Sequence, residues 1–344
     1  MEFPIKKPFG VMPDGTPIHS YTLANGSGMV FNTIQYGAAI TSLKVPLKNG
    51  EVADVVLGFD TIEDYLESID LPAPPHFGAA VGRWAGRINK GSFSLDGRNY
   101  QLTQNSGGHS LHGGRFGFSQ VVWDVERINS EEDPSITFSY FSKDGDENFP
   151  GDLNVEVTYT LSEDNELIVD FWAEAAEDTI INMTQHSYFN LDGHESSISD
   201  QELLINANKT LETIGMIPTG KILSIENTEL DFTSPKKCPQ KIDASFVLNK
   251  PAQIDASLSS KRNNLKMTVS TTQPSVHIYV GGDLFGKLKG KGGAAYHPLS
   301  GICFETQNFP DAPNHPGFPN PILRKGETYK HRTTYQFHHD EGID

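Results

Sequence analysis

The segment Val155-Glu-Val-Thr-Tyr-Thr-Leu161 alternates apolar and polar residues along its whole length. Its apolar residues share one face of an extended chain, because successive side chains of a strand point to opposite sides. The same period of two recurs in residues 167–173 and 265–271. This alternation predicts strands with one face in a core and the other in water, as is typical of antiparallel sheets.

Short-range signals outside these segments also favour strands. Asp96-Gly97 separates Phe93-Ser-Leu95 from Asn99-Tyr-Gln-Leu102, and an Asp-Gly pair between two such runs predicts a tight hairpin. Helix signals are few, and the clearest is Asp60–Ser68, with Asp60 as the expected N-cap and Glu63 closing a capping box. We therefore predict an all-β chain, a large antiparallel β-sandwich with very little helix.

No segment has the composition of an interdomain linker. Residues 130–134 and 257–264 are polar, but strand-like runs flank both, so we interpret them as long turns. The proline-dense stretch 310–321 is expected to be an ordered loop outside the sheet ladders, because proline cannot donate to them. We expect one domain over residues 1–344.

The charge balance excludes several classes of partner. The formal net charge is −17, and residues 124–178 hold 17 acidic residues against Arg127 and Lys143. A nucleic-acid binder needs a basic footprint, and an anionic membrane surface would repel this chain. The acidic segment lacks the spacing of a calcium loop and is expected to form solvated hairpin faces.

Cysteine content and the N-terminus point to a reducing compartment. Cys238 and Cys303 are too few for a disulfide framework. Residues 1–7 contain no apolar targeting segment, and no stretch reaches the ~18 apolar residues of a membrane span. We expect a cytoplasmic protein that is a monomer or weak homodimer.

Three segments carry side chains suited to chemistry. In residues 105–114 four glycines surround His109 and His112; this is either a glycine turn with surface histidines or a ligand-binding loop. A metal site through these two histidines would need further ligands that the sequence does not single out. In residues 182–191, His186, Tyr188 and Asn190 fall on one strand face, which suits either a structural or a functional histidine.

The third segment is Gly301–Asp311. Ile302 and Phe304 are expected to face a core, which puts Glu305 on the opposite face. Glu305 is then either a sheet-surface charge or a functional acid, and Asp311 is its conceivable glycosidase partner.

Together the three segments resemble the galactose mutarotase (aldose 1-epimerase) family. The motifs are S-L-H-G-G-x-x-G-F around His112, T-x-H-S-Y-F-N-L around His186 and C-F-E-T-Q-N-x-P-D-A-x-N around Glu305. Residues 82–88, 243–246, 271–274 and 323–329 match as well, so the resemblance runs from about Phe31 to Phe337.

This resemblance implies a β-supersandwich that interconverts the α- and β-anomers of a free aldohexose, galactose and also glucose, without metal or organic cofactor. Glu305 resembles the family's general base and His186 its general acid, while His112 resembles a second histidine that holds the sugar and supports ring opening. The other positions that match the sugar site are Arg87, Tyr188, Asp243 and His277. Two of the matched positions depart from the family's usual residues, Gly86 from asparagine and His277 from glutamine.

The residue types suit the implied reaction. Opening a cyclic hemiacetal needs a base for the O1 proton, an acid for the ring oxygen O5 and hydrogen bonds to the hydroxyls. Histidine can give and regain a proton near neutrality.

Three other functions remain open from the residues. A sugar-binding module would need no matched acid and base. A hexose-6-phosphate mutarotase would need clustered arginines, for which Arg83, Arg87 and Arg115 are available. A glycosidase would need a second carboxylate ~5–9.5 Å from Glu305.

Overall fold

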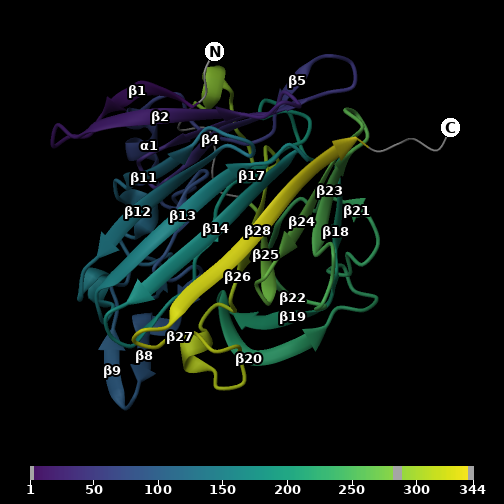
Figure 1. Cartoon of the computed structure of the whole chain (residues 1–344). Coiled ribbons are helices and arrows are strands. Elements are labelled where there is room, and N and C mark those ends of the chain that lie inside the picture. The colour runs from purple at the N-terminus through teal and green to yellow at the C-terminus, as the bar shows by residue number, and fades with distance from the viewer. Residues whose placement is uncertain (1–3, 282–288, 340–344) are drawn as a thin grey trace.

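Strands dominate the computed structural model, which describes residues 4–281 and 289–339 (Figure 1). Within these residues the chain forms three large sheets and four two-stranded ribbons, and the neighbouring strands pair antiparallel. The predicted all-β antiparallel fold with little helix is confirmed.

The largest sheet has nine strands among the described residues, and the yellow β28 crosses its middle in Figure 1. In spatial order they are β11 (Asp124–Asn129), β12 (Ser135–Ser142), β13 (Leu153–Leu161), β14 (Glu166–Ala175), β28 (Thr328–His339), β24 (Leu265–Thr271), β23 (Ala256–Ser260), β18 (Glu202–Ile205) and β21 (Lys236–Lys237). The predicted strands over residues 155–161, 167–173 and 265–271 are confirmed as β13, β14 and β24.

A second sheet runs in the order β17 (Tyr188–Phe189), β26 (Ile302–Gln307), β25 (Ser275–Val280), β22 (Ile242–Leu248), β19 (Ala207–Ile214) and β20 (Ile217–Ser224). The third is a meander of β1 (Ile5–Val11), β2 (Pro17–Ala24), β3 (Val30–Ile34), β4 (Ile40–Pro46) and β5 (Val52–Asp54). The ribbons pair β6 (Ala80–Val81) with β16 (Thr184–Gln185), β7 (Arg87–Ile88) with β10 (Ser110–Leu111), β8 (Ser92–Leu95) with β9 (Arg98–Gln101) and β15 (Thr179–Ile180) with β27 (Ile322–Leu323).

One hydrophobic core joins the three sheets. The rings of Phe31 on β3 and Tyr159 on β13 lie 5.3 Å apart, and those of Phe189 on β17 and Tyr335 on β28 lie 4.9 Å apart. Each fully buried large side chain of this kind contributes ~1.5–3 kcal/mol. The alternation along β13 therefore places its apolar face in the layer between the sheets, where a sandwich needs it.

The segments expected to be irregular follow the prediction in part. Residues 130–134 connect β11 to β12, and in residues 310–321 only a 3₁₀ turn, Ala312–Asn314, is regular. The interpretation of residues 257–264 as a turn was right only for residues 261–264, because residues 257–260 belong to β23. The Asp96-Gly97 hairpin is confirmed between β8 and β9.

Helix is limited to α1 (Ile62–Ser68) and short 3₁₀ turns in the described residues. The predicted N-cap of α1 was wrong by one residue. Thr61 is the cap, and its hydroxyl accepts from the backbone N–H of Asp64. The Asp60 carboxylate instead accepts from the backbone N–H of Gly292, which is distant in sequence, and so does not cap the helix.

The acidic segment forms the hairpin strands β11 to β14, as predicted. Its carboxylates lie on outward faces, where Glu156 pairs with Arg127, and Asp170 accepts from Arg332 at 2.7 Å. In the part of the chain that the structure describes, no helix is long and apolar enough to span a bilayer. Residues 1–3, which belong to the N-terminal segment considered above, lie outside the described residues.

Candidate active site

Strand β26 places a carboxylate in the interior. Phe304 and Thr306 face the large sheet, where the Tyr335 hydroxyl donates to the backbone carbonyl of Phe304 and Thr306 Oγ1 lies 2.5 Å from Thr333 Oγ1. Alternation therefore turns Glu305 to the opposite face. The Glu305 side chain is only 3% exposed, and burial raises the pKa of its carboxyl to about 7.

His186 is held against Glu305 by strands on both sides of it. The preceding Thr184–Gln185 pairs with β6, and the following Tyr188–Phe189 pairs with β26. The His186 side chain is 5% exposed, and its Nε2 lies 3.5 Å from Oε1 of Glu305. Burial lowers the pKa of His186 to about 4. A buried carboxyl and a buried imidazole thus lie in contact, with pKa values shifted in opposite directions.

Cys303 lies behind the His186 ring. Its Sγ is 3.6 Å from Nδ1 of His186, within reach of a sulfur hydrogen bond. The Tyr188 ring lies beside His186, with ring centroids 5.3 Å apart. Asn190 was expected to share this face, but its amide donates to the backbone carbonyls of Ser196 and Ser300 instead. That part of the prediction was wrong, because the strand ends at Phe189 and the chain turns away.

His112 enters the same cluster from the glycine-rich loop. Its ring centroid lies 5.4 Å from that of His186, although 74 residues separate them. The backbone N–H of His112 donates to the Gly86 carbonyl at 3.1 Å, and the Gly86 N–H donates to His112 Nδ1 at 3.3 Å. Since Nδ1 is an acceptor, neutral His112 carries its proton on Nε2. Burial holds the pKa of His112 well below its usual value, so the ring is a neutral Nε2–H donor.

Close backbone packing explains the glycines beside His112. A Cβ atom at Gly113, where φ is +84°, would lie 1.9 Å from the carbonyl oxygen of Gly82. Only glycine fits this approach. Gly113 therefore allows close contact between two backbone segments, one of which leads to Arg87.

Asp243, His277 and Arg87 form a half-buried rim beside Glu305. His277 on β25 is the direct strand partner of Glu305, and its Nε2 lies 3.1 Å from Oδ1 of Asp243 on β22. Their side chains are 17% and 26% exposed, so this edge reaches solvent. The positive charge of Arg87 acts on Asp243, His277 and Glu305, which places its guanidinium near all three.

The structure thus brings together all seven residues singled out for the site, Arg87, His112, His186, Tyr188, Asp243, His277 and Glu305. Sequence reasoning missed His76. Its ring centroid lies 5.2 Å from that of His112 and 6.0 Å from that of His186, and its Nδ1 lies 3.0 Å from Ser119 Oγ. His76 follows two prolines and adopts a left-handed φ of +50°, so no alternation marks its face.

Other candidates have structural roles. His109 Nδ1 accepts from the Lys90 backbone N–H at 3.0 Å, apart from the cluster. Arg83 is 1% exposed and donates to the carbonyls of Pro150 and Gly151. The Asp311 carboxylate accepts from the Asn89 backbone N–H and from the Asn314 amide. These contacts do not support the two alternatives considered from sequence, a metal site through His109 and His112 and a glycosidase pair of Glu305 and Asp311.

The cluster itself superficially resembles a metal site. One ligating atom each of His112, His186 and Glu305 lies within 4.8 Å of the others, the one such group among the described residues. Gly86 argues against ligation, because it puts the His112 proton on Nε2 and occupies the lone pair of Nδ1. A metal needs a free lone pair on a neutral imidazole. The set is better suited to donating and accepting protons than to holding an ion.

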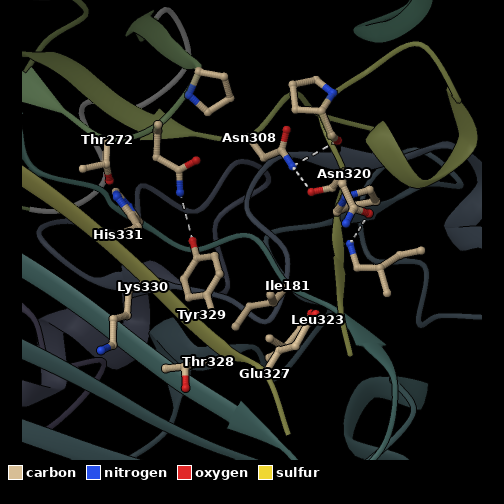
Figure 2. Close-up of a pocket in the computed structure, with 15 residues that line it drawn as sticks. Ile181, Thr272, Asn308, Asn320, Leu323, Glu327, Thr328, Tyr329, Lys330 and His331 are labelled. Atoms are coloured by element: carbon tan, nitrogen blue, oxygen red, sulfur yellow. Dashed lines mark hydrogen bonds between the residues drawn. The ribbon is translucent and has the colours of Figure 1, made fainter. Parts of the chain in front are cut away.

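A separate cavity of about 340 Å³ lies beside the start of β28 (Figure 2). Its lining includes Gln273, Asn308, Tyr329 and His331, and Gln273 donates to the Tyr329 hydroxyl at 3.0 Å. None of the seven candidate site residues lines it.

Known proteins are similar to this chain along nearly its whole length. The model of the family described as aldose 1-epimerase matches residues 19–336. Galactose mutarotase from Homo sapiens is 40% identical over 343 residues, covering 96% of this chain and 97% of that protein. Aldose 1-epimerase from Escherichia coli is 33% identical, covering 94% and 96%.

Solved structures show the same fold. An aldose epimerase homologue from C. elegans superposes with a TM-score of 0.86 at 32% identity, covering 92% of this chain and 98% of that chain. Galactose 1-epimerase from Lactobacillus acidophilus gives a TM-score of 0.85 at 26% identity, covering 98% and 99%.

Proposed function

The chain belongs to the aldose 1-epimerase family, and we propose that Glu305 and His186 are the general base and general acid of its reaction. As a member of this family it is an isomerase that interconverts the α- and β-anomers of an aldose. The observation that carries the assignment of roles is the 3.5 Å contact between two buried groups whose pKa values are shifted in opposite directions.

The proposed steps balance without any other reactant. Glu305 takes the proton from the exocyclic O1 hydroxyl while His186 gives a proton to the ring oxygen O5, and the C1–O5 bond breaks to leave an open-chain aldehyde. The aldehyde turns about the C1–C2 bond. Glu305 then returns its proton to the former carbonyl oxygen, O5 attacks C1, and the O5 proton goes back to His186. Each group ends as it began, so the same pair works in both directions.

The shifted pKa values favour ring opening. A raised pKa makes the Glu305 carboxylate a stronger base, and a lowered pKa makes the His186 imidazolium a stronger acid. The two transfers leave a neutral carboxylic acid beside a neutral imidazole, the forms that burial stabilises. The ring-open state therefore gains stability relative to the closed-ring complex. The reactive ion pair, Glu305 carboxylate with His186 imidazolium, is rarer in the free enzyme than the neutral pair.

The remaining residues are proposed to hold the sugar. Neutral His112 directs its Nε2–H into the cluster as a donor to a sugar oxygen. Arg87, Asp243 and His277 at the half-buried rim offer charged groups to hydroxyls, and Tyr188 supports the His186 ring from the interior. The substrate is a free aldohexose, galactose and also glucose, as the names of the relatives suggest.

The structure disfavours a phosphorylated substrate. Arg83, one of three arginines considered for a phosphate, is buried and donates to backbone carbonyls. Arg115 lies over the exposed ring of Phe116. We further propose that the chain is one catalytic domain that works in the cytoplasm as a monomer or weak homodimer.

Polarimetry of freshly dissolved α-galactose tests the proposal, with the spontaneous rate subtracted. Glu305→Gln keeps the shape of the side chain but removes the base, so the rate should fall ~10²–10⁴-fold. Galactose binding and the melting temperature should stay close to wild type. More than a tenth of the wild-type rate would contradict the role of Glu305. Parallel runs with glucose and glucose 6-phosphate test the substrate class.

A further inference from the structure

A row of polar side chains crosses three neighbouring strands of the second sheet. Glu305 on β26 pairs with His277 on β25, and His277 pairs with Ser245 on β22. Directly paired residues lie on the same face of a sheet, and Asp243, two positions from Ser245, lies on that face too. His277 is therefore the immediate neighbour of the proposed base.

Both ring nitrogens of His277 are held by oxygen atoms. Nε2 lies 3.1 Å from Oδ1 of Asp243, and Nδ1 lies 2.8 Å from Oγ of Ser245. A carboxylate can only accept here, and a hydroxyl can accept as well as donate. The negative charge of the Asp243 carboxylate favours the protonated ring, and the Ser245 hydroxyl can accept the second N–H of that form.

We propose that His277 is a positioning residue that carries a positive charge beside Glu305 and keeps that carboxylate ionised more of the time. This inference rests on the proposed function, because it takes Glu305 to be the base. It assigns to His277 an electrostatic role distinct from contact with the sugar.

The other groups around the row agree with this role. Three charged groups act on Glu305: His277 and Arg87 lower its pKa, and Asp243 raises it, all against the larger effect of burial. The neighbouring titratable groups include His76, His112, His186, Tyr188, Cys303 and Tyr335. Burial keeps these six in their neutral forms near neutral pH, so they bring no competing charge.

The pair of His277 and Asp243 is itself consistent with opposite charges. Burial acts to lower the pKa of His277, but the hydrogen bond and charge of Asp243 outweigh it and the pKa is raised. Burial acts to raise the pKa of Asp243, but His277, Arg87 and Lys241 outweigh it and the pKa is lowered.

His277→Gln tests the proposal, since glutamine keeps hydrogen bonds but carries no charge. The upper limb of the kcat/KM profile against pH reports loss of the last proton from the Glu305–His186 pair. Removing the charge should move this limb up by about one pH unit. The maximal rate should fall by less than about tenfold, because the charge of His277 also lowers the pKa of His186 and the two shifts partly cancel in the population of the reactive ion pair.

Ser245→Ala supplies a second, milder variant, because it removes one partner that favours protonated His277. In Ser245→Ala the upper limb of the kcat/KM profile should move in the same direction by a smaller amount. In the double variant this limb should move no further than in His277→Gln alone. His19→Gln on β2, where the ring contacts Gln35, is the matched control and should leave the limb in place.

The outcomes separate this inference from the proposed function. An unmoved limb in His277→Gln, with a raised KM or a lowered melting temperature, overturns the electrostatic role. Should Glu305→Gln prove inactive while that limb stays in place, only this inference fails. High activity of Glu305→Gln would instead defeat the proposed function itself.

Discussion

The Glu305–His186 pair and His331 are both buried, and burial lowers the pKa of both histidines, to about 4 for His186 and about 3 for His331. Their surroundings differ. His186 faces a carboxylate whose pKa is raised, whereas the His331 ring stacks on Phe171 at 5.3 Å. Among the described residues, neither ring nitrogen of His331 has a hydrogen-bond partner of normal geometry.

This difference distinguishes the proposed catalytic histidine, His186, from the buried His331. Burial alone shifts a pKa by excluding water, but it supplies no second group with which the histidine could share a proton transfer. The Glu305–His186 pair adds a second group with the opposite shift, together with the His112 donor pointing into the same space. The cavity of Figure 2 near His331 is lined by amides, prolines, a tyrosine hydroxyl and the charged side chains of Glu327 and Lys330, and no group there contacts His331 as Glu305 contacts His186.

The largest expected effects lie in the catalytic cluster. His186→Asn should lower kcat ~10²-fold or more with little change in KM, because it removes the acid for O5. His112→Asn should raise KM as well as lower kcat, because a hydrogen bond to the bound sugar is lost. Steady-state polarimetry with melting curves checks both. Near-wild-type kinetics of either variant would remove it from the site.

The pH profile should reveal a shared proton. The reaction needs one proton on the pair, so kcat/KM should follow a bell with apparent limbs near pH 4 and pH 7, which belong to the pair rather than to either residue. Above the upper limb the acid is lost, and below the lower limb the base is lost, with a fall of about tenfold per pH unit. A rate constant that stays flat from pH 5 to pH 9 would disagree with this picture.

His331→Leu should leave kcat within about twofold and act on stability alone. Its folded pKa of about 3 lies below the unfolded value, so the unfolded chain binds the proton first as pH falls. The resulting stability is complete above about pH 6.5 and is lost as pH falls toward 3. The fall in melting temperature between pH 7.5 and pH 5 should therefore be smaller in His331→Leu than in the wild type, by about 2–4 °C. A large loss of turnover would break the contrast with His186.

The smallest expected effect is that of chelation. Excess EDTA should leave the rate unchanged, because Gly86 directs the His112 proton to the atom that a metal would need. Loss of activity that a divalent metal restores would show instead that His112, His186 and Glu305 ligate an ion.

Most of the fold and the core of the site could be predicted from sequence. Alternation located β13, β14 and β24, and it placed Glu305 opposite Phe304 on β26. The motifs around His112 and His186 identified both histidines. The error at α1 arose because the Asp60 carboxylate accepts from Gly292, a contact that local capping rules cannot contain.

The sequence by itself determined the all-β class, the strands β13, β14 and β24 with the side of each that faces the core, and the side chains that are chemically able to move a proton. Only the tertiary structure decided how they combine. It placed His76 beside His112, put Cys303 behind His186, assigned the His112 tautomer through Gly86, and aligned Ser245, His277 and Glu305 in one row. The reason is that alternation is a local property of one strand, whereas these contacts depend on which strands pair and in what register, and many pairings satisfy the same alternation.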